Sequence, residues 1–237
     1  MWAKQAFACG LLLPAMAGLS AQDEYRAAAG DYAVTATADG FVVEHQGQPL
    51  TLGSYFTVFR PEYNGSVLTS ARAWEEGAVV VSGDGRTIAL EATMPEGSVG
   101  YSVEVSEKGL HVRASITVAE GVDIGAVEYA AFQIRPELIE GATVEVWDGA
   151  GSAIDYQAVP GAPKRGAFAR TGTGLTFKTP DRQIIVSSSS PVGIYPFDAR
   201  VGQYGAKQGV WVFTTIPAAA GAEAVSEIDL SVAPPRA

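Results

Sequence analysis

Two groups of side chains in the sequence have the types and spacing to do chemistry. In the first, His111 and Arg113 alternate on a predicted strand, and Glu104 on the preceding strand falls opposite His111. A histidine within reach of a carboxylate is the arrangement of an oriented general base. It is also an ordinary cross-strand polar pair, which stabilises a sheet by about 0.2–1 kcal/mol. Because such pairs are common on open sheets, the structural interpretation is favoured over the catalytic one.

The second group lies between Gly193 and Gly209 (GIYPFDARVGQYGAKQG). It combines aromatic with charged side chains: Tyr195, Phe197, Asp198, Arg200, Tyr204 and Lys207. In sugar-binding sites aromatic rings stack on the C–H face of a pyranose, and charged or amide groups bond its hydroxyls. The segment therefore predicts a ligand-binding loop for carbohydrate. The structural alternative is a long loop folded onto the edge of the protein, with the rings of Tyr195 and Phe197 packed inward.

Other candidate chemistry is sparse. Phe59 to Gly65 (FRPEYNG) repeats the aromatic and charged composition, but a turn between strands is the simpler interpretation. A hydrolase would need two acids, such as Glu62 and Asp198. The acids between Asp148 and Asp155 lack the spacing of a calcium loop. The sequence contains no G-x-S-x-G elbow, P-loop, H-E-x-x-H or cysteine pair for zinc, so we expect neither a cofactor nor a metal.

Residues 1–21 have the pattern of a secretory signal peptide. One charge at Lys4 precedes an apolar run, and Leu19-Ser20-Ala21 is a small-residue cleavage pattern. The apolar run is too short to span a bilayer, and no later run is long enough. We therefore expect cleavage after Ala21, a periplasmic or extracellular location and no membrane insertion. Cleavage also removes Cys9, the only cysteine.

The mature chain is strongly acidic. Without Lys4 it has 16 − 1 = 15 basic residues against 26 acidic ones, a formal net charge of −11. An excess of negative charge repels polyanions. The balance thus argues against nucleic acid, or an anionic membrane, as a partner.

The clearest local signal is the alternation from Tyr101 to Val118. Apolar side chains occupy every second position on both sides of Glu107-Lys108-Gly109, with polar ones between them. This period of two predicts a β-hairpin with one dry and one wet face. Matching the faces pairs Val105 with Leu110, which leaves Glu107 and Lys108 as the turn and lets Gly109 take a positive φ.

Short alternating runs continue along the whole chain, separated by turn residues about every 8–12 positions. We count roughly thirteen or fourteen strands, one of them ARAWEEGAVVV (71–81), and expect one helical turn at Pro136 to Glu140. Residues 22–30 are expected to be a lead-in, either a frayed helical turn or disordered. Since no linker interrupts residues 31–237, they predict one all-β domain, a single large antiparallel two-sheet β-sandwich of the supersandwich type.

Three tryptophans fall in predicted strands. Trp74, Trp147 and Trp211 are expected to pack in the core or between sheets instead of serving as binding platforms. Trp147 is the best exception, because Val144 and Val146 take the opposite face of its strand.

Several stretches resemble a known family. FQIRPELIEGATVEVWD (132–148) is similar to a strand–turn–strand step of bacterial β-sandwich domains that accompany carbohydrate-active enzymes; GLTFKTPDRQIIVSSSSPVGIYPFDAR (174–200), VWVFTTIP (210–217) and EIDLSV (227–232) continue in the same style. Over residues 85–232 the chain resembles the supersandwich of the galactose mutarotase type, or the N-terminal sandwich of some polysaccharide-degrading enzymes. The resemblance implies a role near glycans. For a mutarotase it also implies two histidines and a carboxylate, and the second histidine here, His45, lies in a polar turn.

We therefore expect a secreted, non-catalytic carbohydrate-binding protein whose partner is a polysaccharide or oligosaccharide. One alternative is a carbohydrate-active enzyme, an epimerase, lyase or hydrolase, with its site on the polar sheet face around His111 and Arg113. The other is a structural or adhesion subunit that binds a protein partner through a sheet edge.

Overall fold

The predicted hairpin forms in the predicted register. In the computed structural model, which describes residues 25–37, 39–158, 171–188, 193–200, 208–214 and 216–235, its strands are β9 (Gly97–Ser106) and β10 (Gly109–Val118). Val105 pairs with Leu110, and Glu104 pairs with His111. Gly109 has a φ of 147°, and a Cβ there would lie 2.3 Å from the carbonyl oxygen of Leu230, so the position requires glycine.

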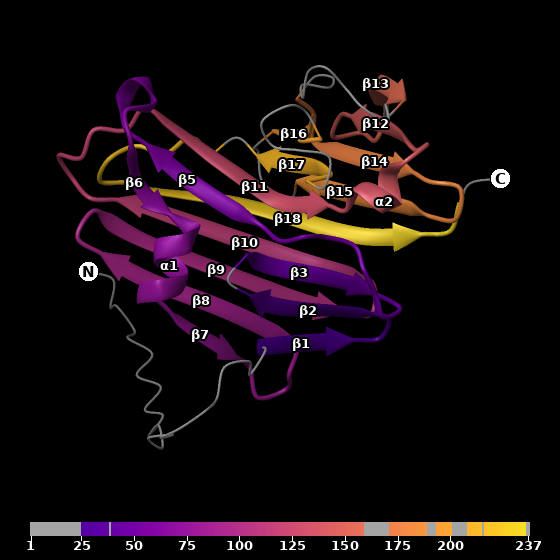
Figure 1. Cartoon of the computed structure of the whole chain (residues 1–237), viewed down its shortest axis with the longest axis horizontal. Coiled ribbons are helices and arrows are strands. Elements are labelled where there is room, and N and C mark those ends of the chain that lie inside the picture. The colour runs from indigo at the N-terminus through magenta and orange to yellow at the C-terminus, as the bar shows by residue number, and fades with distance from the viewer. Residues whose placement is uncertain are drawn as a thin grey trace, which may run out of the picture.

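This hairpin is the middle of a nine-stranded antiparallel sheet with the order β13-β12-β14-β15-β18-β10-β9-β8-β7. In Figure 1, β7, β8, β9, β10 and β18 follow one another across the sheet. The other strands are β7 (Ala78–Val81), β8 (Thr87–Met94), β12 (Thr143–Trp147), β13 (Ala153–Ala158), β14 (Gly174–Lys178), β15 (Gln183–Ser188) and β18 (Glu223–Ala233).

Two smaller antiparallel sheets form the second layer. The five-stranded sheet has the order β16 (Ile194–Asp198), β17 (Val210–Thr214), β11 (Ala126–Ile134), β5 (Tyr55–Phe59) and β6 (Ser66–Thr69). The four-stranded sheet has the order β1 (Tyr25–Ala29), β2 (Tyr32–Thr37), β3 (Gly40–His45) and β4 (Gln48–Pro49). The backbone N–H of Leu52 donates to the carbonyl oxygen of Gln133 at 2.8 Å, and that of Gln133 donates to Gly53 at 3.1 Å. These bonds hold the segment between β4 and β5 against β11, and the molecule is the predicted all-β sandwich.

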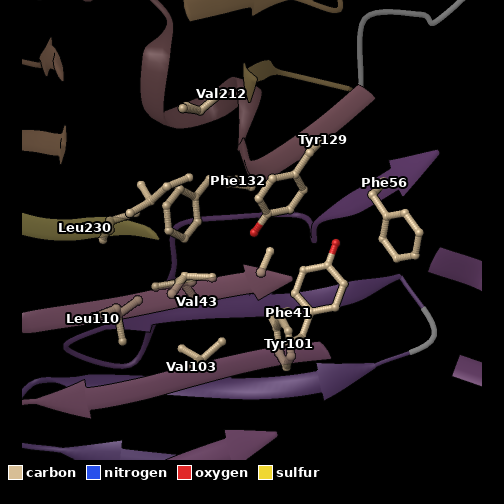
Figure 2. Packing of buried hydrophobic residues seen from close by; sticks show 14 of the residues in the cluster. Phe41, Val43, Phe56, Tyr101, Val103, Leu110, Tyr129, Phe132, Val212 and Leu230 are labelled. Atoms are coloured by element: carbon tan, nitrogen blue, oxygen red, sulfur yellow. The ribbon is translucent and has the colours of Figure 1, made fainter. Parts of the chain in front are cut away.

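The core lies between the two layers. Tyr101 and Val103 of β9 face Phe56 and Tyr129 of the second layer (Figure 2). The hydroxyls of Tyr101 and Tyr129 point into the space between the layers, and neither finds a hydrogen-bond partner in the described part of the chain. Burial raises the pKa of both hydroxyls, because a buried phenolate would lose its hydration.

The expectation of a strand across residues 71–81 is wrong for its first half, which is helical. Helix α1 (Ser70–Glu76) begins after Thr69, whose hydroxyl accepts a hydrogen bond from the backbone N–H of Arg72 at 3.3 Å. Arg72 also pairs with Glu76 one turn later at 2.7 Å. An N-cap and an i,i+4 ion pair both stabilise a helix. Trp74 lies on this helix, not on a strand, and packs against the core.

The lead-in also differs from expectation, because β1 pairs with β2 along its whole length. Ala27 is buried against the core, while Arg26 beside it bonds Glu44 at the surface. This alternation is too short to be recognised without its partner strand. In total eighteen strands are described, more than predicted.

The predicted single helical turn is present as α2 (Pro136–Ile139), and a short 3-10 turn, η1 (Pro61–Tyr63), joins β5 to β6. None of the described helices is long and apolar enough to cross a membrane. The predicted signal peptide, residues 1–21, lies outside the described residues.

Candidate functional site

The outer face of the five-stranded sheet, which points away from the core, is aromatic. Strand register aligns its side chains in two rows: Tyr195, Phe213, Ala130 and Tyr55 in one, and Phe197, Trp211 and Gln133 in the other. We call the five rings of Tyr55, Tyr195, Phe197, Trp211 and Phe213 the aromatic face. The side chains between them along each strand enter the core, so both faces of this sheet carry large apolar side chains.

The rings of the aromatic face hold one another in place. Tyr195 stacks on Phe213 with a centroid distance of 5.4 Å and an interplanar angle of 19°, and Phe197 stacks on Trp211 at 6.0 Å and 30°. Tyr55 meets Trp211 edge-on at 5.4 Å and 78°. Trp211 and Phe213 are buried, whereas the other three rings are partly exposed. Because such contacts fix ring orientation, the exposed parts of the three rings form a preset surface.

A hollow of about 470 Å³ adjoins the aromatic face at Tyr55. Its lining includes the carboxylate of Asp39, the amides of Gln133 and Gln208 and the hydroxyl of Ser70. These groups come from the β2–β3 turn, β11, the segment before β17 and α1. An aromatic ring beside amide, hydroxyl and carboxylate groups can stack on a sugar ring and bond its hydroxyls.

The segment from Gly193 to Gly209 is not loop throughout, because its first part is β16. Tyr195 and Phe197 lie on the outer side of that strand, within the aromatic face. Two of the other predicted ligand-binding residues, Tyr204 and Lys207, lie outside the described residues.

Asp198 and Arg200 bond to each other instead of pointing outward. The guanidinium of Arg200 donates to both carboxylate oxygens of Asp198, at 2.9 and 2.6 Å, and its backbone N–H donates at 3.0 Å. Their side chains are only 1% and 5% exposed, for Asp198 and Arg200 respectively. In this conformation the pair shapes the end of β16 and does not present its charge to a ligand. The hydrolase pairing with Glu62 finds no support here, since Glu62 lies in the exposed turn η1.

The electrostatics of the aromatic face favour neutral groups. Burial raises the pKa of Glu128, which lies on the same side of β11. Burial, together with the nearby charge of Glu128, raises the pKa of Tyr195, so its hydroxyl keeps its proton at neutral pH. Tyr63, in the predicted turn between β5 and β6, contacts Phe59 at 5.0 Å and is 64% exposed at the rim of this face.

The second predicted group lies on the outer face of the nine-stranded sheet, as the alternation indicated. Glu104 and His111 line one hollow of about 280 Å³. The Nδ1 atom of His111 contacts Oδ1 of Asp229 on β18 at 2.8 Å. Arg113 does not line this hollow, because it is paired with Glu223 at 3.3 Å and lies 3.7 Å from Glu227. The structure therefore unites His111 with two carboxylates and holds Arg113 apart.

The two histidines are far apart in the fold. His45 ends β3 and lines a different hollow with Asp181 and Arg182. Burial lowers the pKa of His45, since the charged imidazolium loses hydration. His45 and His111 thus do not form the two-histidine site that the family resemblance implied.

Sequence reasoning missed several residues of both surfaces. Tyr55 and Gln133 alternate with core residues on their strands, so period two could have placed them on an outer face. Asp229 had the same signal in SEIDLSV. Its contact with His111 depends on β18 lying beside β10, which nothing local in the sequence indicates.

Metal binding finds no support among the residues that the structure describes, where no cluster of three or more His, Cys, Asp or Glu side chains could hold an ion. The carboxylate of Asp148 instead accepts hydrogen bonds from the backbone N–H groups of Ala150 and Ser152, at 3.0 Å each.

The predicted sheet-edge partner stays a prediction. Edge strand β7 is apolar, and its Val80 is 60% exposed.

Comparisons with known proteins identify the fold. No protein-family model and no curated protein sequence matches the chain. A putative aldose 1-epimerase from Escherichia coli K12 is similar in structure, with a TM-score of 0.59 and 13% identity over 89% of this chain and 99% of that one. A galactose mutarotase-like protein from Lactobacillus casei has a TM-score of 0.50 and 10% identity over 87% of this chain and 99% of that one.

A larger enzyme shares the same architecture in part. A glycoside hydrolase family 97 enzyme from Pseudoalteromonas sp. strain K8, in complex with panose, has a TM-score of 0.51 and 10% identity over 85% of this chain. The match covers 34% of the hydrolase, so this chain spans about a third of it. At these identities the likeness concerns the fold. The chain is thus a β-sandwich of the galactose mutarotase-like type.

Proposed function

We propose that this protein binds carbohydrate without catalysing a reaction, at the aromatic face and its adjoining hollow. One observation carries the proposal. An outer sheet surface carries five aromatic rings, three of them partly exposed, next to a hollow lined by amide, hydroxyl and carboxylate groups. Apolar surface left on the outside of a soluble protein marks an interaction site, and the convergent polar groups specify a polyhydroxylated ligand.

The similar structures support a sugar as that ligand. One is described as a putative aldose 1-epimerase, and the family 97 hydrolase holds panose. The proposed partner is an oligosaccharide or polysaccharide, bound through ring stacking and hydroxyl bonds.

The residue types around the hollow support binding over catalysis. Among the residues that the structure describes, Asp39 is the only carboxylate that lines it, and neither His45 nor His111 does. Acid–base chemistry at a sugar needs at least two groups that exchange protons on opposite sides of the reacting bond. The buried pair of Asp198 and Arg200 is too well satisfied internally to supply the second.

Tyr55→Ala tests the site. The ring supplies a stacking contact of about 0.5–1.5 kcal/mol, so retention in gels that contain polysaccharide should weaken roughly two- to twelvefold. Gln133→Ala should weaken retention in the same gels, because it removes an amide from the hollow and leaves all five rings of the aromatic face present.

Tyr25→Ala is the matched control, since it removes an exposed tyrosine of β1 that belongs neither to the aromatic face nor to the hollow. Its retention should equal that of the wild type. Unchanged retention in folded Tyr55→Ala and Gln133→Ala proteins would refute the site. A wild-type protein that binds no glycan on an array would refute the function.

A carbohydrate-active enzyme on the polar face is the second candidate, favoured by the 2.8 Å contact between His111 and Asp229. A carboxylate on Nδ1 can fix the tautomer of the imidazole and leave Nε2 to exchange a proton. Polarimetry of fresh α-D-galactose or α-D-glucose tests this candidate. Mutarotation above the buffer rate that His111→Ala abolishes would support it, and a rate equal to buffer would exclude an aldose epimerase.

We also propose that the protein is secreted, from the signal-peptide pattern of residues 1–21. The native protein should then begin at Gln22 and occur in the periplasm or the medium. N-terminal sequencing of that fraction checks this, and a mature chain that begins at Met1 would contradict it.

A further inference from the structure

Glu128 is a carboxylate without a basic partner in the middle of an apolar sheet. The strands of the five-stranded sheet contain two charged residues, Glu128 on β11 and Asp198 at the end of β16, and no lysine, arginine or histidine. Asp198 is neutralised by Arg200. Among the described residues Glu128 has no such partner, and burial alone accounts for the rise in its pKa.

Strand register places Glu128 among the rings of the aromatic face. It is opposite Thr57 on β5, so Tyr55 and Phe59, two residues to either side of Thr57, are its diagonal neighbours. Phe213 on β17 is a diagonal neighbour on the other side. Diagonal neighbours in a sheet are about 7–8 Å apart, a distance that aromatic and long side chains can bridge. Three rings therefore lie around the carboxylate.

Two tyrosines extend this group of rings toward the surface. Tyr195 stacks on Phe213 with a centroid distance of 5.4 Å, and Tyr63 of η1 contacts Phe59 at 5.0 Å. Burial, then the charge of Glu128 and the hydroxyl of Tyr63, raise the pKa of Tyr195. The carboxylate and the two hydroxyls therefore act on one another over the same part of the aromatic face. Tyr63 is mostly exposed, so this part is open to a ligand.

The charge of Glu128 opposes folding. Burial disfavours its ionised form, and no contact with the described chain compensates for this cost. A neutral side chain would avoid the cost, and Thr57 and Thr69 occupy the same row on the neighbouring strands β5 and β6. A desolvated acid that lowers stability and has no structural partner is typical of a binding site.

The charges of the adjoining turn do not neutralise Glu128. Turn η1 and the residue before it contribute Glu62 and Arg60, whose formal charges cancel. The charge of Arg60 acts on Glu96, whereas no cation of the described chain acts on Glu128. The carboxylate therefore gives this end of the aromatic face a net negative charge, surrounded by the negative faces of aromatic rings.

We propose that the aromatic face selects a sugar with a protonated amino group, and that Glu128 binds this group. The ammonium forms an ion pair with the carboxylate, and the rings of Tyr63 and Tyr195 attract its charge by cation–π contacts. Tyr55 both lines the hollow and neighbours Glu128, so an oligosaccharide that stacks on Tyr55 reaches both. The ligand class is an oligosaccharide of amino sugars without acetyl groups. This selectivity rests on the proposed function, because it concerns the same site.

A neutral sugar and an acidic sugar lack this advantage. A neutral sugar offers the carboxylate only hydroxyl groups, which form weaker bonds than an ammonium does. A uronic acid brings a like charge to Glu128, and like charges brought together at an interface disfavour the wrong partner.

Three tetrasaccharides with the same β-1,4 linkage isolate the amino group. They are the tetramers of glucosamine, N-acetylglucosamine and glucose, which carry an ammonium, an acetamide and a hydroxyl group at C2. Affinities are measured by isothermal titration calorimetry at pH 6.0 and low ionic strength. Trilysine supplies ammonium groups without a sugar. Glu128→Gln removes the charge, and Glu91→Gln is the matched control, because Glu91 is an exposed carboxylate on β8 of the other layer.

The wild type should bind the glucosamine tetramer about tenfold more tightly than the other two sugars and trilysine. Glu128→Gln should lose about fivefold of that affinity and keep its affinity for the neutral tetramers within about twofold. Glu91→Gln should match the wild type with every ligand. Added salt should narrow the preference for the glucosamine tetramer, since salt screens an ion pair that is partly exposed.

Equal affinity for the three tetramers overturns the selectivity and leaves the proposed function standing. A wild type that does not bind the glucosamine tetramer overturns it too, whereas only a failure to bind any glycan on an array refutes the proposed function. Unchanged affinity of folded Glu128→Gln for the glucosamine tetramer also overturns it. An equal loss in Glu91→Gln, or trilysine bound as tightly as the amino sugar, would trace the preference to the acidic charge of the whole chain and has the same consequence.

Discussion

Val112→Asp probes the division of the central hairpin into a dry and a wet face. Val112 is 3% exposed and pairs with Val103 on one side and Ile228 on the other, all of them core residues. The substitution puts a carboxyl group between the two layers, where no cation of the described structure lines the core.

The magnitude follows from two terms. Loss of a buried valine side chain costs about 1.5–3 kcal/mol. Burial raises the pKa of a carboxyl group by up to about 3–5 units, and each unit corresponds to about 1.4 kcal/mol. Because the unfolded pKa is about 3.9 and the buried carboxyl takes up a proton instead of paying more, this adds at most about 4 kcal/mol at pH 7. The sum of about 5.5–7 kcal/mol is comparable to the whole stability of a typical domain, about 5–15 kcal/mol.

Urea or thermal unfolding of Val112→Asp against Ser102→Asp measures the effect. Ser102 lies on the wet face directly opposite Arg113, so its replacement should change the free energy of unfolding by less than about 1 kcal/mol. The penalty in Val112→Asp should also depend on pH. The introduced carboxyl has a raised pKa in the folded state, so the penalty is full above that pKa and shrinks as the pH falls toward the unfolded value.

Equal loss of melting temperature in both variants would show that both faces are buried. A Val112→Asp protein as stable as the wild type would contradict the burial of this position. Either result would contradict the strand register that assigns alternate residues to the core and to the outer faces of the sheets.

Three further changes have defined outcomes. Tyr101→Phe removes a buried hydroxyl that has no partner in the described structure, so urea unfolding should show a change within about 1 kcal/mol; a loss of several kcal/mol would reveal an unseen bond. Asp198→Asn removes the carboxylate charge that bonds the buried guanidinium of Arg200 and should cost about 3–5 kcal/mol, whereas Asp181→Asn, in an exposed pair, should cost under about 1 kcal/mol; equal costs would contradict the burial of the first pair. Glu128→Gln should raise the melting temperature at pH 7.5, because the raised pKa of Glu128 means that its charged form destabilises the folded state above that pKa; the gain should vanish below pH 4.5, and a gain that persists there would have another origin.

Local alternation in the sequence is sufficient to predict most of the strands and the pairing of β9 with β10. Every apolar residue between Tyr101 and Val118 that was expected on the dry face is buried, and the turn forms where Gly109 allows it. Register follows because a slip by one residue would expose the whole dry face. The same period of two was enough to predict an all-β sandwich, and the single helical turn expected at Pro136 to Glu140 is present as α2. It failed at α1, where an N-cap and an ion pair outweighed the β-branched run that follows.

The candidate site was only half visible in the sequence. Composition singled out Tyr195 and Phe197 as candidates, and the structure places both on the outer side of β16, within the aromatic face. Asp198 and Arg200 share that composition, yet they bond each other in the fold. A sequence shows which groups are present and not which of them are already satisfied.

Strand order was decided by the tertiary structure alone. Alternation along a strand assigns each side chain to one face of the sheet. Any antiparallel neighbour is compatible with that assignment, so the order of the strands across a sheet depends on how the loops and the core pack. Only that order puts Asp229 beside His111, lays Trp147 over Gly174, and brings Tyr55 next to Trp211. The sequence by itself therefore determined the elements, the faces and the central hairpin. Packing between distant strands determined which residues share a surface.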